Sequence, residues 1–294
     1  MPFLDDRPPP FYRLPIEIRL QIYSYLLTPP IDNDETNNPQ FVTQKQYAPL
    51  PRTARSHQPP TLHIRTLEPR HFCTLTPSLP HKFLVRDFRG RSAFTSFALS
   101  PKPSLYPNIL AVNRSLRAET AQVLYSSNVF DFGTCVEAIA PFFSSLQSET
   151  RELIKVVRIT KRPQCYDKEF DRLAWDAAME YLASMNLERL ELVVIAGKPA
   201  IMPGVRGAVL GQEGDEIRPY DDEEWPGLME AEGFEWVRGL VSVKGLREVR
   251  LEKLEGHSPP AVSKGLERWV RFSSSVESSF GRFCQKRMVG TLAT

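Results

Sequence analysis

The 294-residue sequence lacks the features that mark secreted, membrane and disulfide-bonded proteins. No apolar run approaches the roughly 18 residues that a membrane span needs. The N-terminus, MPFLDDRPPP, is acidic and proline-rich, whereas a signal peptide is basic and then apolar. Four cysteines, Cys73, Cys135, Cys165 and Cys284, lie far apart with no C-x-x-C pair, which favours free thiols in a reducing compartment. We therefore expect a cytoplasmic or nuclear protein that does not enter a membrane.

The motifs of catalysis and cofactor binding are also missing. The sequence contains no G-x-S-x-G, no H-E-x-x-H and no glycine-rich phosphate loop. His63, His71, Cys73 and His81 are spaced too irregularly for a zinc site, and the acidic stretch 211–232 lacks the alternating ligands of a calcium loop. We therefore predict a non-enzymatic protein with no metal and no cofactor.

Proline sets the first third of the chain apart from the rest. Residues 28–107 hold 13 of the 26 prolines and separate a first apolar helix from a second helical pattern. Between 32 and 69 too little apolar surface is available to offset the entropy of ordering, so we expect a largely disordered or extended insert. Within the insert, apolar residues of 82–99 flank Arg89-Gly90-Arg91 and predict a short hairpin.

The insert is also basic. Between Lys45 and Arg91 there are nine Lys or Arg residues and only two acids, Glu68 and Asp87. Such a strip can contact nucleic acid or an acidic partner. Aromatic residues are sparse along it and no recognition motif surrounds it, so a solvated basic loop is the favoured interpretation. The net charge of +2 for the whole chain does not point to nucleic acid either.

Regular structure is predicted to resume over residues 108–145. Apolar residues recur there at helical spacing, with Asn108 suited to cap the helix and Asn128 suited to end it in the left-handed conformation. The VFDF segment after Asn128 predicts a short strand. Thr134-Cys-Val-Glu137 has the spacing of a capping box and predicts another short helix, which Pro141 disturbs or ends.

The C-terminal half carries an internal repeat. The segments IKVVRI (154–159), LERLEL (187–192) and LREVRL (246–251) share the pattern Φ-x-x-Φ-x-Φ, where Φ is aliphatic. The alternation predicts a strand, and the leading aliphatic residue enters the core as the strand begins. The segments start 33 and then 59 residues apart (187 − 154 and 246 − 187), and a loop at 197–224 accounts for most of the excess.

Helical patterns at 168–185, 233–244 and 261–284 separate or follow these strands. Strand–helix units with right-handed crossovers give a parallel sheet lined on one side by helices, as in leucine-rich repeats. The acidic loop at 197–232 is interpreted as an unstructured lid. The charged residues between the Φ positions predict one sheet face, either a partner-binding surface or, more commonly, a solvated face of mixed sign: Arg158, Arg189, Glu191, Glu248, Arg250 and Glu252.

Two segments, Arg13–Leu27 and Leu110–Phe132, carry a family resemblance. RLPIEIRLQIYSYLL resembles the first helix of F-box domains, and is closer still to fungal proteins that begin L-P-x-E-I-R-x-x-I-Y. Those proteins continue, after a variable insert, with L-x-V-[CN]-R-x-[IL]-x-x-E-x-x-x-[VL]-L-Y-x-x-N-x-F-x-F. The matching segment here is LAVNRSLRAETAQVLYSSNVFDF, and the strand–helix tail is also similar to the C-terminal part of these fungal F-box-like proteins.

The resemblance implies an F-box-like helical unit and a role as a receptor. In the F-box family the helices dock on a Skp-type adaptor of a cullin–RING ubiquitin ligase, while C-terminal repeats hold the substrate. An 80-residue insert separates the two halves of the unit in this chain, and Leu116 stands where an aromatic residue is usual. Carried over by position, the adaptor contacts would be Leu14, Pro15, Ile18, Ile22, Leu26, Val112 and Leu116.

A helical projection gives the first helix two apolar faces. Four side chains point within about 40° of one direction: Ile16, Leu20, Tyr23 and Leu27. Four others occupy a second sector: Ile18, Ile22, Tyr25 and Leu26. The first face can meet the second helix, so the other must lie against the repeat region or against another protein.

We therefore predict a mixed α/β protein. Residues 11–27 and 108–145 form the F-box-like helical unit, 28–107 the insert, and 146–290 a strand–helix repeat region with a small parallel sheet. The predicted function is a non-catalytic protein-interaction module, specifically an F-box-type substrate receptor for an unknown protein substrate. The alternative is a self-contained scaffold that uses the first helix only as core. Nucleic-acid binding through the insert is a third interpretation.

Overall fold

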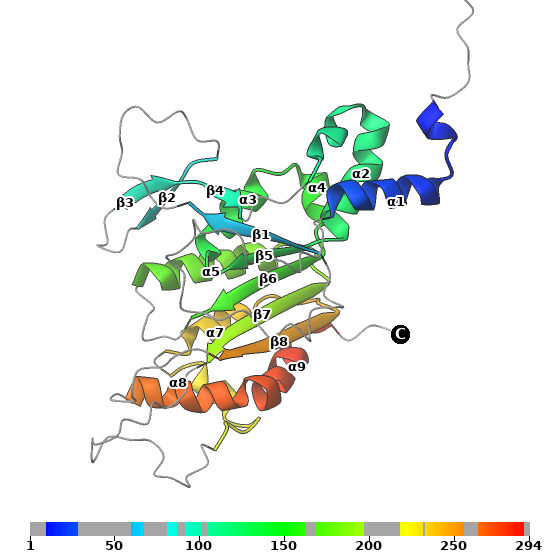
Figure 1. The fold of residues 1–294 in the computed structure, drawn as a ribbon. Helices are drawn as coiled ribbons and strands as arrows, with labels where there is room; N and C mark the ends of the chain where they lie inside the picture. The colour runs from blue at the N-terminus through cyan, green and yellow to red at the C-terminus, as the bar shows by residue number, and fades with distance from the viewer. Residues whose placement is uncertain are drawn as a thin grey trace, which may run out of the picture.

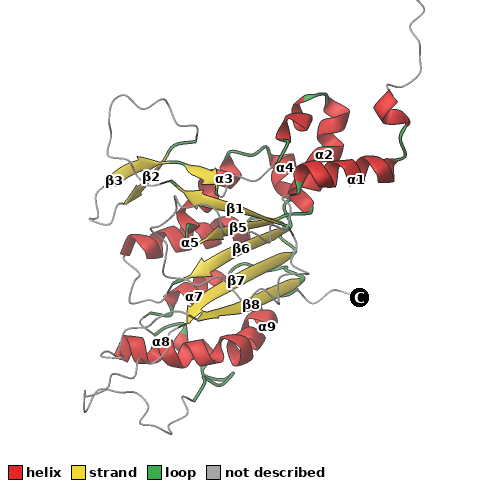
Figure 2. Cartoon of the chain, in the orientation of Figure 1, coloured by secondary structure: helices red, strands yellow, loops and turns green. Residues whose placement is uncertain are grey.

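The computed structural model describes residues 10–28, 60–67, 81–86, 92–100, 105–162, 169–196, 218–231, 233–255 and 264–290. The protein is mixed α/β, which confirms the predicted fold class. A six-stranded, mostly parallel sheet forms its centre, with helices around it (Figure 1; Figure 2). The strand order is β4-β1-β5-β6-β7-β8, so that all strands except β4 follow one another in chain order.

Five strands of the main sheet run parallel: β1 (Thr61–Thr66), β5 (Val129–Gly133), β6 (Val156–Lys161), β7 (Arg189–Ala196) and β8 (Glu248–Glu255). The short β4 (Phe97–Leu99) pairs antiparallel with β1 at the edge. A separate two-stranded ribbon consists of β2 (Phe83–Arg86) and β3 (Ser92–Thr95), which correspond to the hairpin expected over 82–99.

The three repeat segments lie side by side in register. Val157 pairs with Leu190, and Leu190 with Val249, so the fourth position of each repeat falls in one row across the sheet. The leading aliphatic residues are all buried: Ile154, Leu187 and Leu246. Each repeat therefore enters the core before its strand begins, as the pattern predicts.

Helices cover the face of the sheet that carries the aliphatic repeat positions. In Figure 1, α5 (Glu169–Ala183) and α7 (Glu235–Leu240) lie behind the sheet. Beside β8 run α8 (Lys264–Ser275) and α9 (Gly281–Met288), joined by a π-helical turn, η7 (Val276–Phe280). This turn interrupts the single helix expected over 261–284 while Trp269, Phe280 and Phe283 all remain buried.

Indole side chains fill the core between the sheet and these helices. Trp175, Trp236 and Trp269 are buried, and the Trp175 and Trp236 rings meet edge to face at 5.6 Å between centroids. The Trp175 Nε1–H donates to the Trp236 carbonyl at 3.0 Å, and the Trp269 Nε1–H donates to the Ile195 carbonyl at 3.2 Å. Both indoles thus bury a large apolar surface and still satisfy their only donor.

The proline-rich insert contributes to the main sheet, where a largely disordered or extended segment was expected. Leu62 and Ile64 alternate with polar residues in TLHIRT, and both are buried. Strand β1 therefore lies inside the sheet between β4 and β5. The prediction missed it because its short alternation is flanked by prolines and interrupted by charge. The remaining insert residues, 29–59, 68–80, 87–91 and 101–104, lie outside the described residues.

The second helix begins later than predicted. Asn108 lies in a 3₁₀ turn, η4 (Pro107–Ala111), and Asn113 caps α2 (Arg114–Ser126) by accepting from the Leu116 N–H at 2.9 Å. Asn128 is not left-handed, because His81 is the only described non-glycine residue with positive φ. Beyond β5 the chain forms η5 (Val136–Ala138), α3 (Ile139–Ser144) and α4 (Ser148–Leu153), and Pro141 sits inside the first turn of α3.

Part of the acidic loop is ordered, contrary to the prediction of an unstructured lid. Residues 218–231 are described and include a helical turn, α6 (Trp225–Leu228). Trp225 is fully buried and its ring lies 4.8 Å from that of Phe280. Glu224 accepts from Arg271 at 3.0 Å. Burial of Trp225 thus holds in place an acidic stretch whose composition alone predicts a solvated loop. Residues 197–217 and 232 lie outside the described residues.

Candidate protein-interaction surface

The first helix, α1 (Ile16–Leu27), is fixed to α2 by a partly buried polar contact. Tyr23 is fully buried, and its hydroxyl donates to Glu119 Oε2 at 2.8 Å. Arg19 Nη2 donates to Glu119 Oε1 at 3.1 Å, so both carboxylate oxygens hold α1. Burial and the neighbouring Glu119 raise the pKa of Tyr23, so the hydroxyl stays a donor.

Both ends of α1 have a further anchor. Before the helix, η1 (Pro10–Arg13) places the Phe11 ring 5.9 Å from that of Tyr23, and the Tyr12 hydroxyl donates to Asn113 Oδ1 at 2.9 Å. After the helix, buried Asn128 donates through Nδ2 to the Leu124 carbonyl at 2.7 Å and to the Leu27 carbonyl at 3.3 Å. One amide thus satisfies carbonyls at the C-terminal ends of both helices.

The second apolar sector, Ile18, Ile22, Tyr25 and Leu26, is called here the outer face of α1. Ile18 is 44% exposed and Tyr25 is 75% exposed, while Ile22 and Leu26 are half-buried. Leu14, just before the helix, is exposed as well. Figure 1 shows α1 projecting from the body of the molecule, so the repeat region does not cover the outer face.

Exposure extends to the first sector too. Only Tyr23 and Leu27 are buried there, while Ile16 and Leu20 are exposed. An apolar surface of this size on one short helix exceeds the scattered apolar residues of an ordinary protein surface. The anchored but largely uncovered α1 is therefore the strongest candidate for a docking surface.

The start of α2 adds a notch next to η4. Val112 is 64% exposed there. A cavity of about 400 Å³ opens beside it, lined by Leu110, Ala111, Asn113, Arg114 and Arg117. Leu116, which the resemblance also implied as an adaptor contact, is instead buried beneath this surface. Pro15 is exposed at the start of α1.

The predicted charged residues of the sheet do come together, on the face opposite the aliphatic repeat positions. One row of paired positions crosses all five parallel strands, and from Asp131 to Arg250 the charges alternate in sign; we call it the charge row: His63, Asp131, Arg158, Glu191 and Arg250. Opposite charges directly across neighbouring strands stabilise a sheet, whereas like charges destabilise it. The row therefore supports the observed register of the strands.

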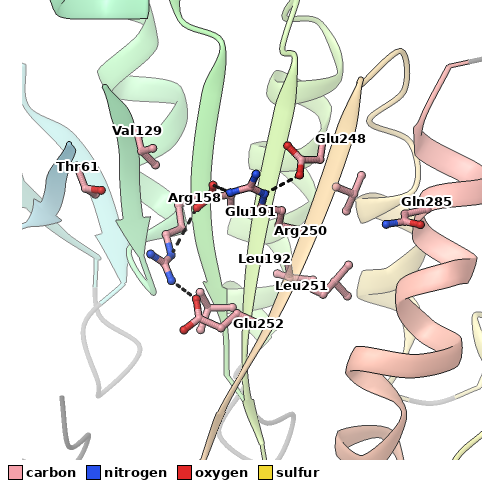
Figure 3. Close-up of a pocket in the computed structure, with 12 residues that line it drawn as sticks. Thr61, Val129, Arg158, Glu191, Leu192, Glu248, Arg250, Leu251, Glu252 and Gln285 are labelled. Atoms are coloured by element: carbon pink, nitrogen blue, oxygen red, sulfur yellow. Dashed lines mark hydrogen bonds and ion pairs between the residues drawn. The ribbon is translucent and has the colours of Figure 1, made fainter. Parts of the chain in front are cut away.

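Neighbouring rows complete the ion pairs (Figure 3). Arg189 lies 3.0 Å from Glu191 and 3.5 Å from Glu248, and Arg250 lies 2.6 Å from Glu248. Arg158 pairs with Glu252, and its Nε lies 4.0 Å from Glu191 Oε2. The hydrogen bond from Arg250 lowers the pKa of Glu248. Except for Arg189, these side chains line a cavity of about 400 Å³, and they form ion pairs with one another across it.

The cluster at the β1 end of the charge row was not predicted from the sequence. His63 Nδ1 lies 2.7 Å from Asp131 Oδ2, and Arg65 Nη2 donates to the same oxygen at 3.2 Å. Burial alone would raise the pKa of Asp131, but the contacts with His63 and Arg65 outweigh it and lower the pKa to about 2. The Gly133 N–H also donates to Asp131 Oδ1, at 2.6 Å.

Gly133 completes this cluster through its backbone. Its φ of +52° favours glycine, and a Cβ there would lie 3.1 Å from the Arg65 guanidinium carbon. Two features of the sequence could have located the cluster: the strand alternation of TLHIRT, and the acid in the strand VFDF. An Asp–His pair without a nucleophile or a third metal ligand does not by itself constitute an active site. Among the described residues, no three His, Cys, Asp or Glu side chains gather as for a metal ion.

No family model, no curated protein and no solved structure matches the chain. Within the described part of the chain, no helix is long and apolar enough to cross a membrane. The function of the protein must therefore be inferred from its surfaces.

Proposed function

We propose that the protein is a non-catalytic interaction module whose outer α1 face binds a partner protein, as in an F-box-type receptor that docks on a Skp-type adaptor. The observation that carries the proposal is the combination of a firm anchor and an uncovered surface on the same helix. Tyr23 and Arg19 hold α1 through Glu119, while Ile18 and Tyr25 point to solvent. A helix used only as core would bury these residues.

The anchoring makes α1 suited to binding. Because its position is set before a partner arrives, little conformational entropy is lost on association. Covering Ile18, Tyr25, Leu14 and Val112 removes apolar surface from water, which is the main driving force of such interfaces. The half-buried Ile22 and Leu26 support this surface from below.

In the proposed mechanism the protein brings two partners together. One surface holds the ligase adaptor, and another holds a substrate close to the ubiquitin-loaded enzyme. The reaction is then favoured by a raised effective concentration and needs no catalytic group on this chain. The internally paired charges of the sheet are consistent with a role that requires no reactive side chain.

The direct test is binding of the purified full-length chain to a purified Skp-type adaptor, measured by calorimetry. We expect Ile18→Asp combined with Tyr25→Asp to weaken binding by at least about tenfold, because two charges would be buried in the interface. Leu173→Asp on α5 is the matched control, since Leu173 is an apolar residue whose exposure of 65% lies between the 44% of Ile18 and the 75% of Tyr25. Urea unfolding of each variant verifies that the fold is retained.

Three outcomes are distinguishable. Adaptor binding that the double variant loses and the control keeps supports the proposal. Equal binding by all three chains contradicts the assignment of the outer face. Absence of adaptor binding by the unmodified chain favours the scaffold alternative, in which α1 serves its own fold.

A further inference from the structure

The notch between η4 and the start of α2 brings positive charge next to the apolar docking surface of α1. Its lining includes Arg114 and Arg117, and both side chains are exposed. Neither guanidinium has a hydrogen-bond or ion-pair partner within the described part of the chain. Arg19, by contrast, is held by Glu119 at 3.1 Å. The charge of the notch is therefore not neutralised by the neighbouring helices.

The two arginines do not stabilise the helix to which they belong. Both lie at the start of α2, whose first turn contains no acidic residue. The amide dipoles of a helix disfavour positive charge at this end. The cap is supplied by Asn113, whose side chain accepts from the Leu116 N–H. The packing and capping of α2 therefore do not account for Arg114 and Arg117.

The notch combines this charge with apolar surface. Leu110 lines the notch and packs against the hydrophobic core, and Val112, at the end of η4, is 64% exposed. Covering an exposed aliphatic side chain is favourable because it removes apolar surface from water. An occupant that matches the notch must therefore supply a negative group and an apolar group close together.

The notch adjoins the docking surface of α1. The Tyr12 hydroxyl donates to Asn113 Oδ1 at 2.9 Å, which places the start of α2 beside η1. Leu14, two residues after Tyr12, is exposed and leads to Ile18 on the outer face of α1. A partner that covers Leu14 and Ile18 is therefore within reach of the notch.

The charge of the helical unit indicates the kind of partner. Residues 10–28 and 105–128 contain four bases and two acids, a net charge of +2 (4 − 2): Arg13, Arg19, Arg114, Arg117, Glu17 and Glu119. An acidic partner is attracted to such a surface and a basic one is repelled. A nucleic acid also matches the charge, but its phosphates do not cover an exposed valine. The observations therefore favour a protein segment that is both acidic and apolar.

We propose that the notch binds an acidic segment of the partner protein that covers the outer face of α1. A carboxylate of this segment pairs with Arg114 and Arg117, and a neighbouring apolar side chain covers Val112. The identity of the partner rests on the proposed function of α1, whereas the chemistry of the segment rests on the notch.

The test uses a peptide of repeated Asp-Glu-Leu, titrated into the isotopically labelled full-length protein. We expect saturable shifts of the amide signals of 110–117. Arg114→Gln combined with Arg117→Gln should weaken binding by about tenfold, because two exposed ion pairs are lost. Arg172→Gln combined with Arg238→Gln is the matched control, since it removes the same charge from exposed positions of α5 and α7.

Two measurements separate binding from folding and from general attraction. Urea unfolding of the Arg114→Gln, Arg117→Gln variant should match that of the unmodified chain, because Gln and Arg have similar helix propensity. A loss of stability would overturn the proposal, since the arginines would then serve the fold. A peptide with Lys in place of each acid should not bind.

The purified Skp-type adaptor distinguishes this inference from the proposed function. If the adaptor binds, the Arg114→Gln, Arg117→Gln variant should bind it about tenfold more weakly and with a smaller dependence on salt. If the peptide binds at the notch and the adaptor binds no variant, the notch assignment stands and the proposed function fails.

Three results would overturn the notch assignment. The acidic peptide does not bind, it binds the notch variant and the control equally, or the adaptor binds the notch variant as tightly as it binds the unmodified chain. Oligothymidine that shifts 110–117 and binds more tightly than the peptide would overturn the assignment in favour of nucleic acid.

Discussion

The outer face of α1 and the charged face of the sheet differ in how their side chains are satisfied. On the sheet, each arginine of the central rows lies within 4.0 Å of a glutamate. On α1, four apolar side chains, Ile16, Ile18, Leu20 and Tyr25, are exposed to solvent. A surface whose charges are paired with one another gains little from a partner. Covering an apolar surface that is held rigidly in water is favourable, because it removes that surface from water. This difference, and not the amount of charge, directs the functional proposal to the helix.

The largest effect should come from removing the anchor of α1. Tyr23→Ala leaves a cavity and removes the hydrogen bond to Glu119 Oε2, so we expect a loss of about 3 to 5 kcal/mol in the free energy of unfolding. Tyr25→Ala, two residues away and 75% exposed, should change it by less than about 0.5 kcal/mol. Urea unfolding measures both. Equal effects of the two substitutions would mean that the two faces of α1 are not distinct.

The next effect concerns the centre of the sheet face. Glu191 lies within 4.0 Å of three arginines, Arg158, Arg189 and Arg250, and is largely buried. Glu191→Gln should cost about 2 to 3 kcal/mol, because it removes the shared negative partner of Arg158 and Arg189, whose side chains are only 17% and 20% exposed. Glu180→Gln, at an exposed position of α5, serves as the control. A negligible difference between these two variants would show that the ion pairs contribute no stability.

The third prediction uses pH on the same face. The pKa of Asp131 is about 2 in the folded chain, below its ordinary value of 3.8. Its stabilisation is therefore complete above about pH 4 and is lost as the pH falls through about 2, a change of roughly 2 kcal/mol. Asp131→Asn should flatten the stability profile in this window. The outer face of α1 carries no ionised group, so Ile18→Ala should leave the slope unchanged.

The smallest effect is expected at the helix that supports α1. Asn113→Ala removes the cap of α2 and the acceptor for Tyr12, so stability should fall by about 1 kcal/mol. Asn113→Asp keeps the acceptor and should restore most of the loss. Thermal unfolding of the three chains distinguishes these outcomes. If Ala and Asp behave alike, the side-chain acceptor does not hold the helix start.

The repeat strands were predictable because one local pattern controls them. In each repeat the leading and fourth aliphatic positions are buried, so the pattern fixes the strand, its face and its register with its neighbours. The two apolar faces of α1 were predictable for the same reason. Which part of the protein covers each face depends on tertiary packing, and the helical period does not predict it.

Other features depend on contacts between distant residues. Strand β1 is short and flanked by prolines, and its place is decided by pairing with β5 about 68 residues later, as in the contact of His63 with Asp131. Trp225 makes an acidic segment ordered because an aromatic pocket from α8 and η7 receives it. A high content of charge and proline predicts that a segment stays disordered, because little burial offsets the entropy lost on ordering. Burial of the single Trp225 ring can supply the missing stabilisation.

The anchor of α1 also has a consequence during synthesis of the chain. Arg19 and Glu119 are 100 residues apart, and Asn128 reaches back 101 residues to Leu27. At ordinary translation rates roughly 5 to 20 s pass before the partners of α1 leave the ribosome. For that time both apolar faces of the helix are uncovered. During this interval the nascent chain exposes an apolar helix of the kind that chaperones bind.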